Sequence, residues 1–198
     1  QTACKQNKAW QNKGLPAINM SVNVSARQFK ERDWLDRVIR ALQESGMDAK
    51  YLDLELTESL IMQDVQRSIL KMKELKTMGV QLSIDDFGTG YSSLAYLKRL
   101  PIDKLKIDRE FIKDLPSDEE DCSITKAVIA LSQSLNLSII AEGVETEGQF
   151  DMLKEKHCDE MQGYLFSKPV PVEAVAELLR DGLTKRKPSG KQSDGSAV

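Results

Sequence analysis

Six short segments of this chain alternate apolar and polar residues with a period of two, and longer helical patterns separate them. Such alternation predicts strands that have one apolar face and one polar face. A regular succession of strand and helix predicts a parallel sheet, because each helix returns the chain to the same edge. The predicted strands cover residues 19–25, 52–58, 80–85, 104–108, 138–142 and 160–166.

The polar faces of these strands restrict the fold further. Parallel strands covered on both sides are normally apolar on both sides, and an open sheet between two helix layers would bury charges at a large desolvation cost. A (β/α)8 barrel avoids that cost, because its strands share an interior and its active site lies at their carboxyl ends. We therefore predict an α/β fold of the TIM-barrel type, with these polar residues toward the strand ends: Asn23, Glu55, Asp85, Lys106 with Asp108, Glu142 and Gln162.

The number of predicted strands implies an incomplete barrel. Six βα units occupy six of eight places, and such barrels usually contain about 250 residues, whereas this chain has 198. We expect about two strands to be missing on the N-terminal side, so that residues 1–182 form an N-terminally incomplete barrel domain. Residues 183–198 are basic and then rich in Ser, Gly and Lys, which predicts a disordered tail.

Apolar stripes and capping signals set the expected helices. Residues 1–13 continue a helix that Gly14 ends, and Thr146 with Gln149 resembles a capping box. Pro171 suits the first turn of a last helix that reaches about Gly182. The other predicted helices cover residues 34–45, 59–78, 92–99 and 117–136.

Charge and residue usage exclude several classes of protein. The net charge is −3 with no arginine-rich face, so we expect no partner of duplex DNA or RNA. No apolar run approaches the roughly 18 residues of a membrane span. Three scattered cysteines indicate free thiols in a reducing compartment, hence a cytoplasmic protein or a cytoplasmic domain. A single histidine argues against zinc or iron, so any metal should be a hard cation bound by oxygen.

Two adjacent carboxylates, Asp85 and Asp86, end one predicted strand and precede a loop that contains Gly88 and Gly90. Neighbouring carboxylates are tolerated when they are solvated, when one is protonated, or when a cation lies between them. Together with Glu55 and Glu142 they make an excess of negative charge around one lysine. One or two Mg²⁺ or Mn²⁺ ions would balance that charge, and two metals bridged by a carboxylate suit phosphodiester cleavage.

Several segments resemble, in order and spacing, the EAL domain, a family of cyclic di-GMP phosphodiesterases in bacterial signalling. The resemblance covers roughly residues 3–182 and implies a (β/α)8-type barrel with one antiparallel strand. It also implies hydrolysis of cyclic di-GMP to pGpG with two Mg²⁺ or Mn²⁺ ions. The segments that carry it are Asn23-Val24-Ser25, Glu55-Leu56-Thr57-Glu58, Asp85 to Ser93, Lys106-Ile107-Asp108, Glu142-Gly143-Val144-Glu145 and Gln162 to Phe166.

The resemblance implies a role for each matched residue. Metal ligands would come from two overlapping sets, the first of Asn23, Glu55 and Asp85, the second of Asp85, Asp86 and Glu142. Lys106 would lie beside the attacking water and either orient or deprotonate it. The remaining positions would order water, contact the substrate or shape the site: Asp108, Glu145, Gln162, Tyr91 within the loop 87–93, and Glu58 as the anchor of that loop. The resemblance also implies a homodimer, and a sensor or GGDEF-type domain in the parent protein.

One departure from the family pattern limits what the chain should do by itself. No Glu-Ala-Leu segment occurs, although in the family its Glu is a ligand of the first metal. We expect either a fragment of an active parent or a degenerate member, with greatly reduced or no hydrolysis by this chain alone.

Two alternative functions remain open at this point. One is a module that binds cyclic di-GMP without cleaving it. The other is an enolase-like barrel enzyme, in which Lys104 and Lys106 form a Lys-x-Lys pair and one of them removes a carbon-bound proton. The enolase-like chemistry does not need the adjacent aspartates or the glycine loop.

Overall fold

The computed structural model describes residues 1–88 and 94–181. Its six strands form one parallel sheet in the order β1-β2-β3-β4-β5-β6, so each strand pairs with its neighbours in sequence. This topology confirms the predicted succession of strands and helices. The strands are β1 (Met20–Asn23), β2 (Leu52–Thr57), β3 (Gln81–Phe87), β4 (Lys104–Ile107), β5 (Ser138–Glu142) and β6 (Glu160–Gln162).

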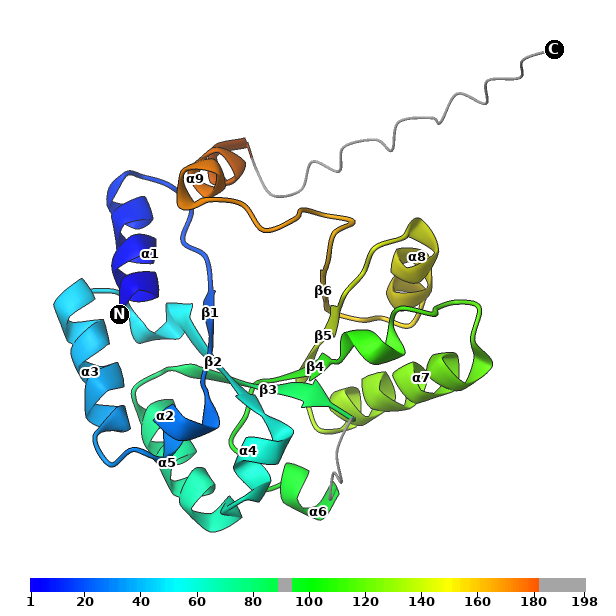
Figure 1. Ribbon diagram of the computed structural model, residues 1–198, viewed down its shortest axis with the longest axis horizontal. Coiled ribbons are helices and arrows are strands. Elements are labelled where there is room, and N and C mark those ends of the chain that lie inside the picture. The colour runs from blue at the N-terminus through cyan, green and yellow to red at the C-terminus, as the bar shows by residue number, and fades with distance from the viewer. Residues whose placement is uncertain (89–93, 182–198) are drawn as a thin grey trace.

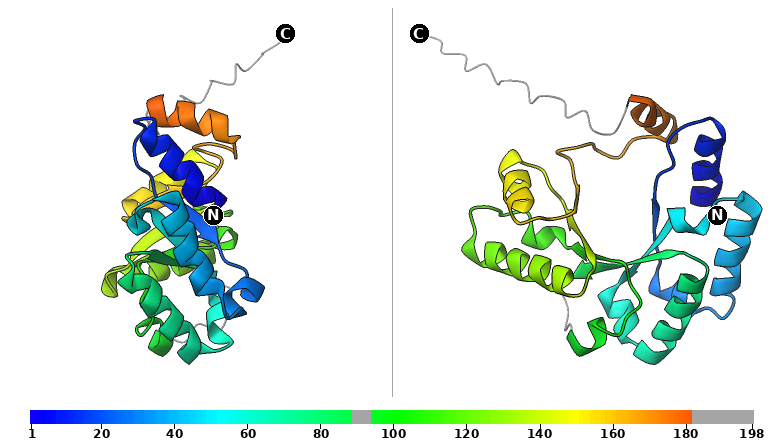
Figure 2. Two further views of the ribbon diagram at one scale, coloured as in Figure 1. Left: turned by 90° about the vertical axis from the view of Figure 1, so that its left-hand side faces the viewer. Right: turned by 180° about the vertical axis from the view of Figure 1, so that it is seen from behind.

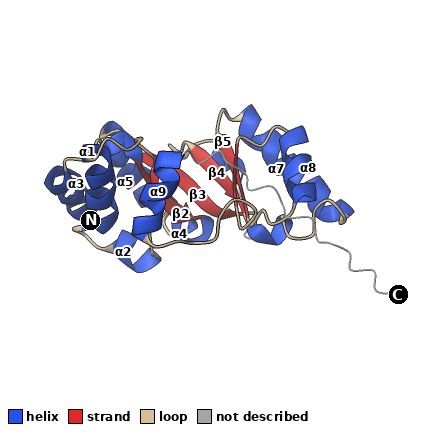
Figure 3. Ribbon diagram, turned by 90° about the horizontal axis from the view of Figure 1, so that it is seen from above, coloured by secondary structure: helices blue, strands red, loops and turns tan. Residues whose placement is uncertain are grey.

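The sheet curls into an arc with helices on its outer side (Figure 1). Seen from above, α1, α3 and α5 lie on the side of β2 and β3, and α7 and α8 lie beside β5 (Figure 3). The helices are α1 (Thr2–Asn12), α2 (Ala26–Lys30), α3 (Trp34–Ser45), α4 (Glu58–Met62), α5 (Val65–Thr77), α6 (Leu94–Leu97), α7 (Glu119–Ser134), α8 (Glu147–Glu155) and α9 (Val172–Asp181), with 3₁₀ turns η1 (Ala49–Tyr51) and η2 (Arg109–Phe111). The half-barrel is the predicted (β/α) architecture.

The apolar parity of each strand faces the helices, as the alternation predicted. Leu56, Leu82, Leu105 and Ile139 are each 0% exposed and belong to one core between the sheet and its helices. Burial of this kind stabilises a fold by roughly 1.5–3 kcal/mol for each large apolar side chain. The opposite parity is therefore left to line the inner side of the arc.

Local capping decided where several helices begin. The structure confirms the predicted helix at residues 34–45 and the capping box of Thr146 with Gln149. The prediction of a single helix over residues 59–78 was wrong. This segment divides into α4 and α5, because the Asp64 side chain accepts a hydrogen bond from the Arg67 N–H and caps a new helix.

The two outer strands are shorter than predicted. After Asn23, Ser25 forms a capping box with Gln28 and starts α2, a helix that the sequence pattern did not predict. After Gln162 the chain turns, with the Phe166 N–H donating to the Gly163 carbonyl. Strand β6 therefore covers only Glu160–Gln162 of the predicted 160–166.

The outer strands β1 and β6 flank the open side of the arc. The segment after β6 crosses this side and leads to α9, which lies near α1 (Figures 1 and 2). The predicted tail at 183–198 lies outside the described residues. None of the described helices has both the length and the apolar character that a membrane span requires.

Candidate active site

Three carboxylates from three strands converge on the ammonium group of Lys106 inside the arc. Its Nζ lies 2.8 Å from Glu55 Oε2 on β2, 3.1 Å from Asp85 Oδ1 on β3 and 2.6 Å from Glu142 Oε1 on β5. The Lys106 side chain is 3% exposed. A cluster of this kind, buried and at the strand ends, is the arrangement that the polar strand faces predicted.

Strand register brings these residues to one level. Asn23 is paired with Glu55, and Glu142 with Gln162, so four strands present polar groups at matching heights. In a parallel sheet the carboxyl ends share one edge, and curling turns that edge into a mouth. The predicted positions on β1 to β6 therefore lie around one opening. We call this opening the mouth.

The environment of Lys106 keeps it protonated. Burial by itself lowers the pKa of this ammonium group, but hydrogen bonds and charges from Glu142 and Glu55 outweigh the burial, so its pKa is raised above the ordinary value. A lysine with a raised pKa donates hydrogen bonds and supplies positive charge near neutral pH. In this arrangement Lys106 supplies positive charge to three carboxylates, and it is poorly suited to deprotonate a water molecule.

The carboxyl groups near Lys106 carry more negative charge than one lysine can balance. Burial, and then the charge of Asp85, raises the pKa of Asp86. Burial also raises the pKa of Glu142, and the charges of Asp85 and Glu55 add to this rise. Both shifts show that the site favours additional positive charge or protons.

Asp86 adopts a backbone conformation that is uncommon outside glycine. Its φ is +56°, and the β3–β4 register shifts between Ile84 and Phe87. The strand is therefore irregular at the two adjacent aspartates, and the strict alternation of faces is interrupted there. Strained backbone of this kind concentrates at functional sites.

Arg109, which the sequence interpretation did not single out, contacts a predicted site residue. Its Nη2 lies 3.1 Å from Glu145 Oε1. The arginine stem crosses the end of β5 so closely that a Cβ on Gly143 would overlap it. Arg109 follows the predicted site residue Asp108, whose side chain accepts the Glu110 N–H at 2.6 Å and starts η2. An arginine directly after a polar strand end was the available sequence signal.

Glu58, the predicted loop anchor, is buried at the start of α4 and is 4% exposed. Within residues 1–88 and 94–181, neither of its carboxylate oxygens has a hydrogen-bonding partner. Leaving a buried charged acceptor unpaired costs more than the roughly 1–3 kcal/mol of a neutral group. The loop that it should anchor, including Tyr91, lies outside the described residues at 89–93, so its anchoring role stays a prediction.

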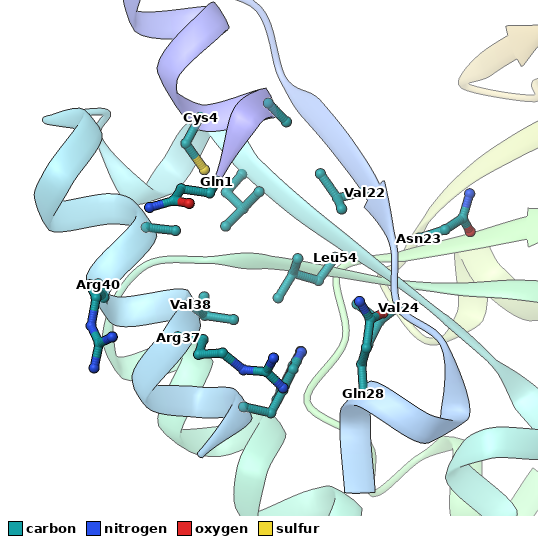
Figure 4. Close-up of a pocket in the computed structure, with 14 residues that line it drawn as sticks. Gln1, Cys4, Val22, Asn23, Val24, Gln28, Arg37, Val38, Arg40 and Leu54 are labelled. Atoms are coloured by element: carbon teal, nitrogen blue, oxygen red, sulfur yellow. The ribbon is translucent and has the colours of Figure 1, made fainter. Parts of the chain in front are cut away.

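The two neutral donors, Asn23 and Gln162, lie on the outer strands and are exposed. Figure 4 shows Val22 on the helix side of β1, and Asn23 directed to the other side. That helix side contains an apolar cavity of about 360 Å³ between α1 and α3, bordered by Cys4, Val38 and Leu54. This cavity is separate from the carboxylates at the mouth.

The donor chemistry at the mouth fits hard divalent cations. The predicted ligands offer carboxylate and amide oxygens, which Mg²⁺ and Mn²⁺ prefer. Within residues 1–88 and 94–181, no group of three His, Cys, Asp or Glu side chains is already arranged as a metal site. Instead, Lys106 balances part of the charge that Glu55, Asp85 and Glu142 would offer to metal.

Fold and site together define a class: a curled parallel α/β protein with an acidic, lysine-centred site at the carboxyl ends of its strands. A family model for the EAL domain matches residues 1–169. The chain belongs to the EAL domain family.

Among curated proteins, the chain is similar to two from Pseudomonas aeruginosa. It is 46% identical over 178 residues to "Cyclic di-GMP phosphodiesterase NbdA", covering 90% of this chain and 23% of that protein. It is 47% identical over 173 residues to "Bifunctional diguanylate cyclase/cyclic di-GMP phosphodiesterase MucR", covering 87% of this chain and 25% of MucR. The chain thus spans about a quarter of the length of these relatives.

Solved structures show the same fold. The structure "PaMucR Phosphodiesterase, c-di-GMP complex" superposes with a TM-score of 0.85 at 46% identity, over 88% of this chain and 70% of that chain. The Klebsiella pneumoniae BlrP1 structure, a manganese and cy-diGMP complex, gives a TM-score of 0.75 at 27% identity, over 84% of this chain and 42% of that chain. Structures in this family have therefore been solved with a divalent metal bound.

Proposed function

We propose that this chain is a domain of the cyclic di-GMP phosphodiesterase type, which linearises cyclic di-GMP to pGpG with two divalent cations. Because it contains no Glu-Ala-Leu segment, we expect little or no hydrolysis by this chain alone. The observation that carries the proposal is the convergence of Glu55, Asp85 and Glu142 on Lys106 at the carboxyl ends of the strands. Family membership, and the names of relatives 46% and 47% identical, support the same reaction.

In this proposal two Mg²⁺ or Mn²⁺ ions would activate water and stabilise the charged oxygens of the phosphodiester when bound. They would be held by Asn23, Glu55, Asp85, Asp86 and Glu142. Lys106 is kept protonated by its carboxylate neighbours, and its N–H groups would become available to orient the attacking water when the cations bind those carboxylates. Arg109 holds the Glu145 carboxylate at the rim, where Glu145, Asp108 and Gln162 would order water and contact the substrate.

The position of Lys104 argues against the enolase-like alternative. Its Nζ lies 3.1 Å from Glu160 and 3.8 Å from Asp53, one layer away from the Lys106 cluster along β4. Successive residues on one strand face are about 7 Å apart, so the two lysines do not act on one substrate atom. A cyclic di-GMP module that does not cleave its ligand remains the second candidate. Retention of the carboxylates around Lys106 favours hydrolysis over mere binding.

The wider context of the domain follows from the same family membership. We propose that the domain works in the cytoplasm, pairs with a second copy, and can be joined to a GGDEF-type or sensor domain. The bifunctional name of MucR supports such an association. Because the net charge is −3, we propose no partner of duplex DNA or RNA.

Calorimetric titration with cyclic di-GMP tests the proposed function. Ca²⁺ replaces Mg²⁺ in the cell so that bound ligand is not cut. We expect saturable binding that needs the cation and is weakened at least tenfold in Asp85→Asn, because that change removes a charged metal ligand. Glu177→Gln, an exposed change on α9, is the matched control and should bind normally. Cation-independent binding would favour the non-catalytic module, and no binding by the folded chain would contradict the proposal.

The affinity of the site for Mn²⁺ should depend on pH in a defined direction. Asp86 and Glu142 have raised pKa values, so protons compete with metal for them at a higher pH than for ordinary carboxylates. We expect Mn²⁺ affinity to fall as the pH is lowered from neutral toward the ordinary pKa of a carboxyl group, about 4. Calorimetry at several pH values measures the trend, and Asp86→Asn should flatten it. A constant affinity over this range would contradict the prediction.

A further inference from the structure

A second polar layer lies beneath the mouth, inside the same arc. Lys104 occupies the inner face of β4, two residues before Lys106, and its side chain is 10% exposed. On one side its Nζ is 3.8 Å from Asp53 Oδ2 on β2. The Asp53 side chain is completely buried and accepts a hydrogen bond from Ser83 Oγ at 2.8 Å. Lys104 therefore neutralises a carboxylate that has no access to water.

On its other side Lys104 reaches past β5 to the outer strand β6. Its Nζ donates to Glu160 Oε1 at 3.1 Å. The residue of β5 that pairs with Glu160 is Ile140, which offers no polar group. The ammonium group thus joins β4 directly to β6, two strands away, and this is possible because the sheet is curled.

Strand β6 is the shortest strand of the described sheet and lies at its edge. It has three residues and one neighbouring strand, β5, within the described sheet. Its next residue, Gly163, packs so tightly on the backbone of Val144 that no side chain fits. Short outer strands with few partners open locally at low free-energy cost. The ion pair of Lys104 with Glu160, which we call the Lys104 tie, would suppress that opening.

We propose that Lys104 is a positioning residue for the mouth. By holding Glu160, Lys104 keeps Gln162 in register with Glu142 and fixes the direction of its side chain. Gln162 lies two residues along β6 on the same face, level with Glu142. Its amide carries no charge, so the charged groups of the site do not by themselves hold it in place. The inference rests on the proposed function, because Gln162 matters only where a ligand occupies the mouth.

Glu160→Val gives the main test in the full chain. It removes the carboxylate, suits a strand, and leaves the Lys104–Asp53 pair intact. We expect amide hydrogen exchange at Gln162, whose backbone faces β5, to accelerate about tenfold, while exchange in β2 and β3 stays unchanged. Lys104→Met should have a similar effect on β6, and Lys104→Arg should restore protection. Glu155→Gln, which breaks an exposed pair with Lys156, is the control and should change nothing in β6.

Coupling to the ligand separates positioning from a merely structural role. We expect Gln162→Ala to weaken Ca²⁺-dependent cyclic di-GMP binding about tenfold in the wild-type background, and much less in the Glu160→Val background. An equal penalty in both backgrounds would overturn the positioning role. Unchanged β6 exchange in both Glu160→Val and Lys104→Met would overturn the tie itself. Lack of binding by the wild-type chain would contradict the proposed function. The hydrogen-exchange experiment would then still show whether the Lys104 tie protects β6.

Discussion

Replacing Lys106 by methionine should destabilise the protein by about 3–5 kcal/mol near neutral pH, because three carboxylates then lack their shared cation. The loss should shrink as the pH falls. Burial already raises the pKa of Glu142 and Lys106 opposes that rise, so without the lysine this pKa rises further, and the folded state binds protons more readily than the unfolded state as the pH is lowered. Denaturant unfolding at several pH values measures both effects.

Divalent cations should partly restore the stability of Lys106→Met, since Mn²⁺ can occupy the same carboxylate cage. Any hydrolysis by the chain should nevertheless fall by about 10²–10³-fold, the usual loss when one preorganised hydrogen-bond donor is removed. Lys113→Met is the control, because Lys113 is 51% exposed and its charge partners are 4.0 and 3.9 Å away. Equal stability of Lys106→Met and the wild-type chain in metal-free buffer would show that the cluster is not formed in solution.

Gly163→Ala should have the second-largest effect, through packing. A Cβ on Gly163 would overlap the backbone oxygen and nitrogen of Val144. Val144 N also donates to the Gln162 carbonyl at 3.0 Å. Backbone atoms cannot rotate away as a side chain does, so we expect a cost near the upper end of the 1–3 kcal/mol that overpacking typically brings, about 3 kcal/mol. Thermal and denaturant unfolding give the value.

The matched control for this change is Gly148→Ala in α8. A Cβ there would lie 3.4 Å from Pro116 Cδ, an ordinary contact. Alanine is favoured over glycine inside a helix by roughly 0.5–1 kcal/mol, so this variant should be slightly more stable than the wild-type chain. Similar destabilisation of both variants would mean that the close approach of Gly163 and Val144 is absent in solution. Cyclic di-GMP binding should also fall in Gly163→Ala, since Gln162 is the preceding residue.

The fold class and the candidate site could be predicted because both depend on local periodicity. A period of two assigns every strand residue to one of two faces, and Glu55, Asp85, Lys106 and Glu142 share the inner one. Local competition explains the errors. Asp64 and Ser25 each cap a helix. The spacing of apolar residues does not report such caps, so it predicts a longer helix at Asp64 and a longer strand at Ser25.

The sequence by itself determined the parallel sheet, the apolar core and the acidic character of the mouth, since spacing along the chain is enough to choose a face. Tertiary structure decided which charges meet. The three partners of Lys106, the contact of Arg109 with Glu145, and the reach of Lys104 from Asp53 to Glu160 all join strands or loops distant in sequence. Their distances depend on strand register and on the curl of the sheet, and neither quantity is encoded in the pattern of any single strand.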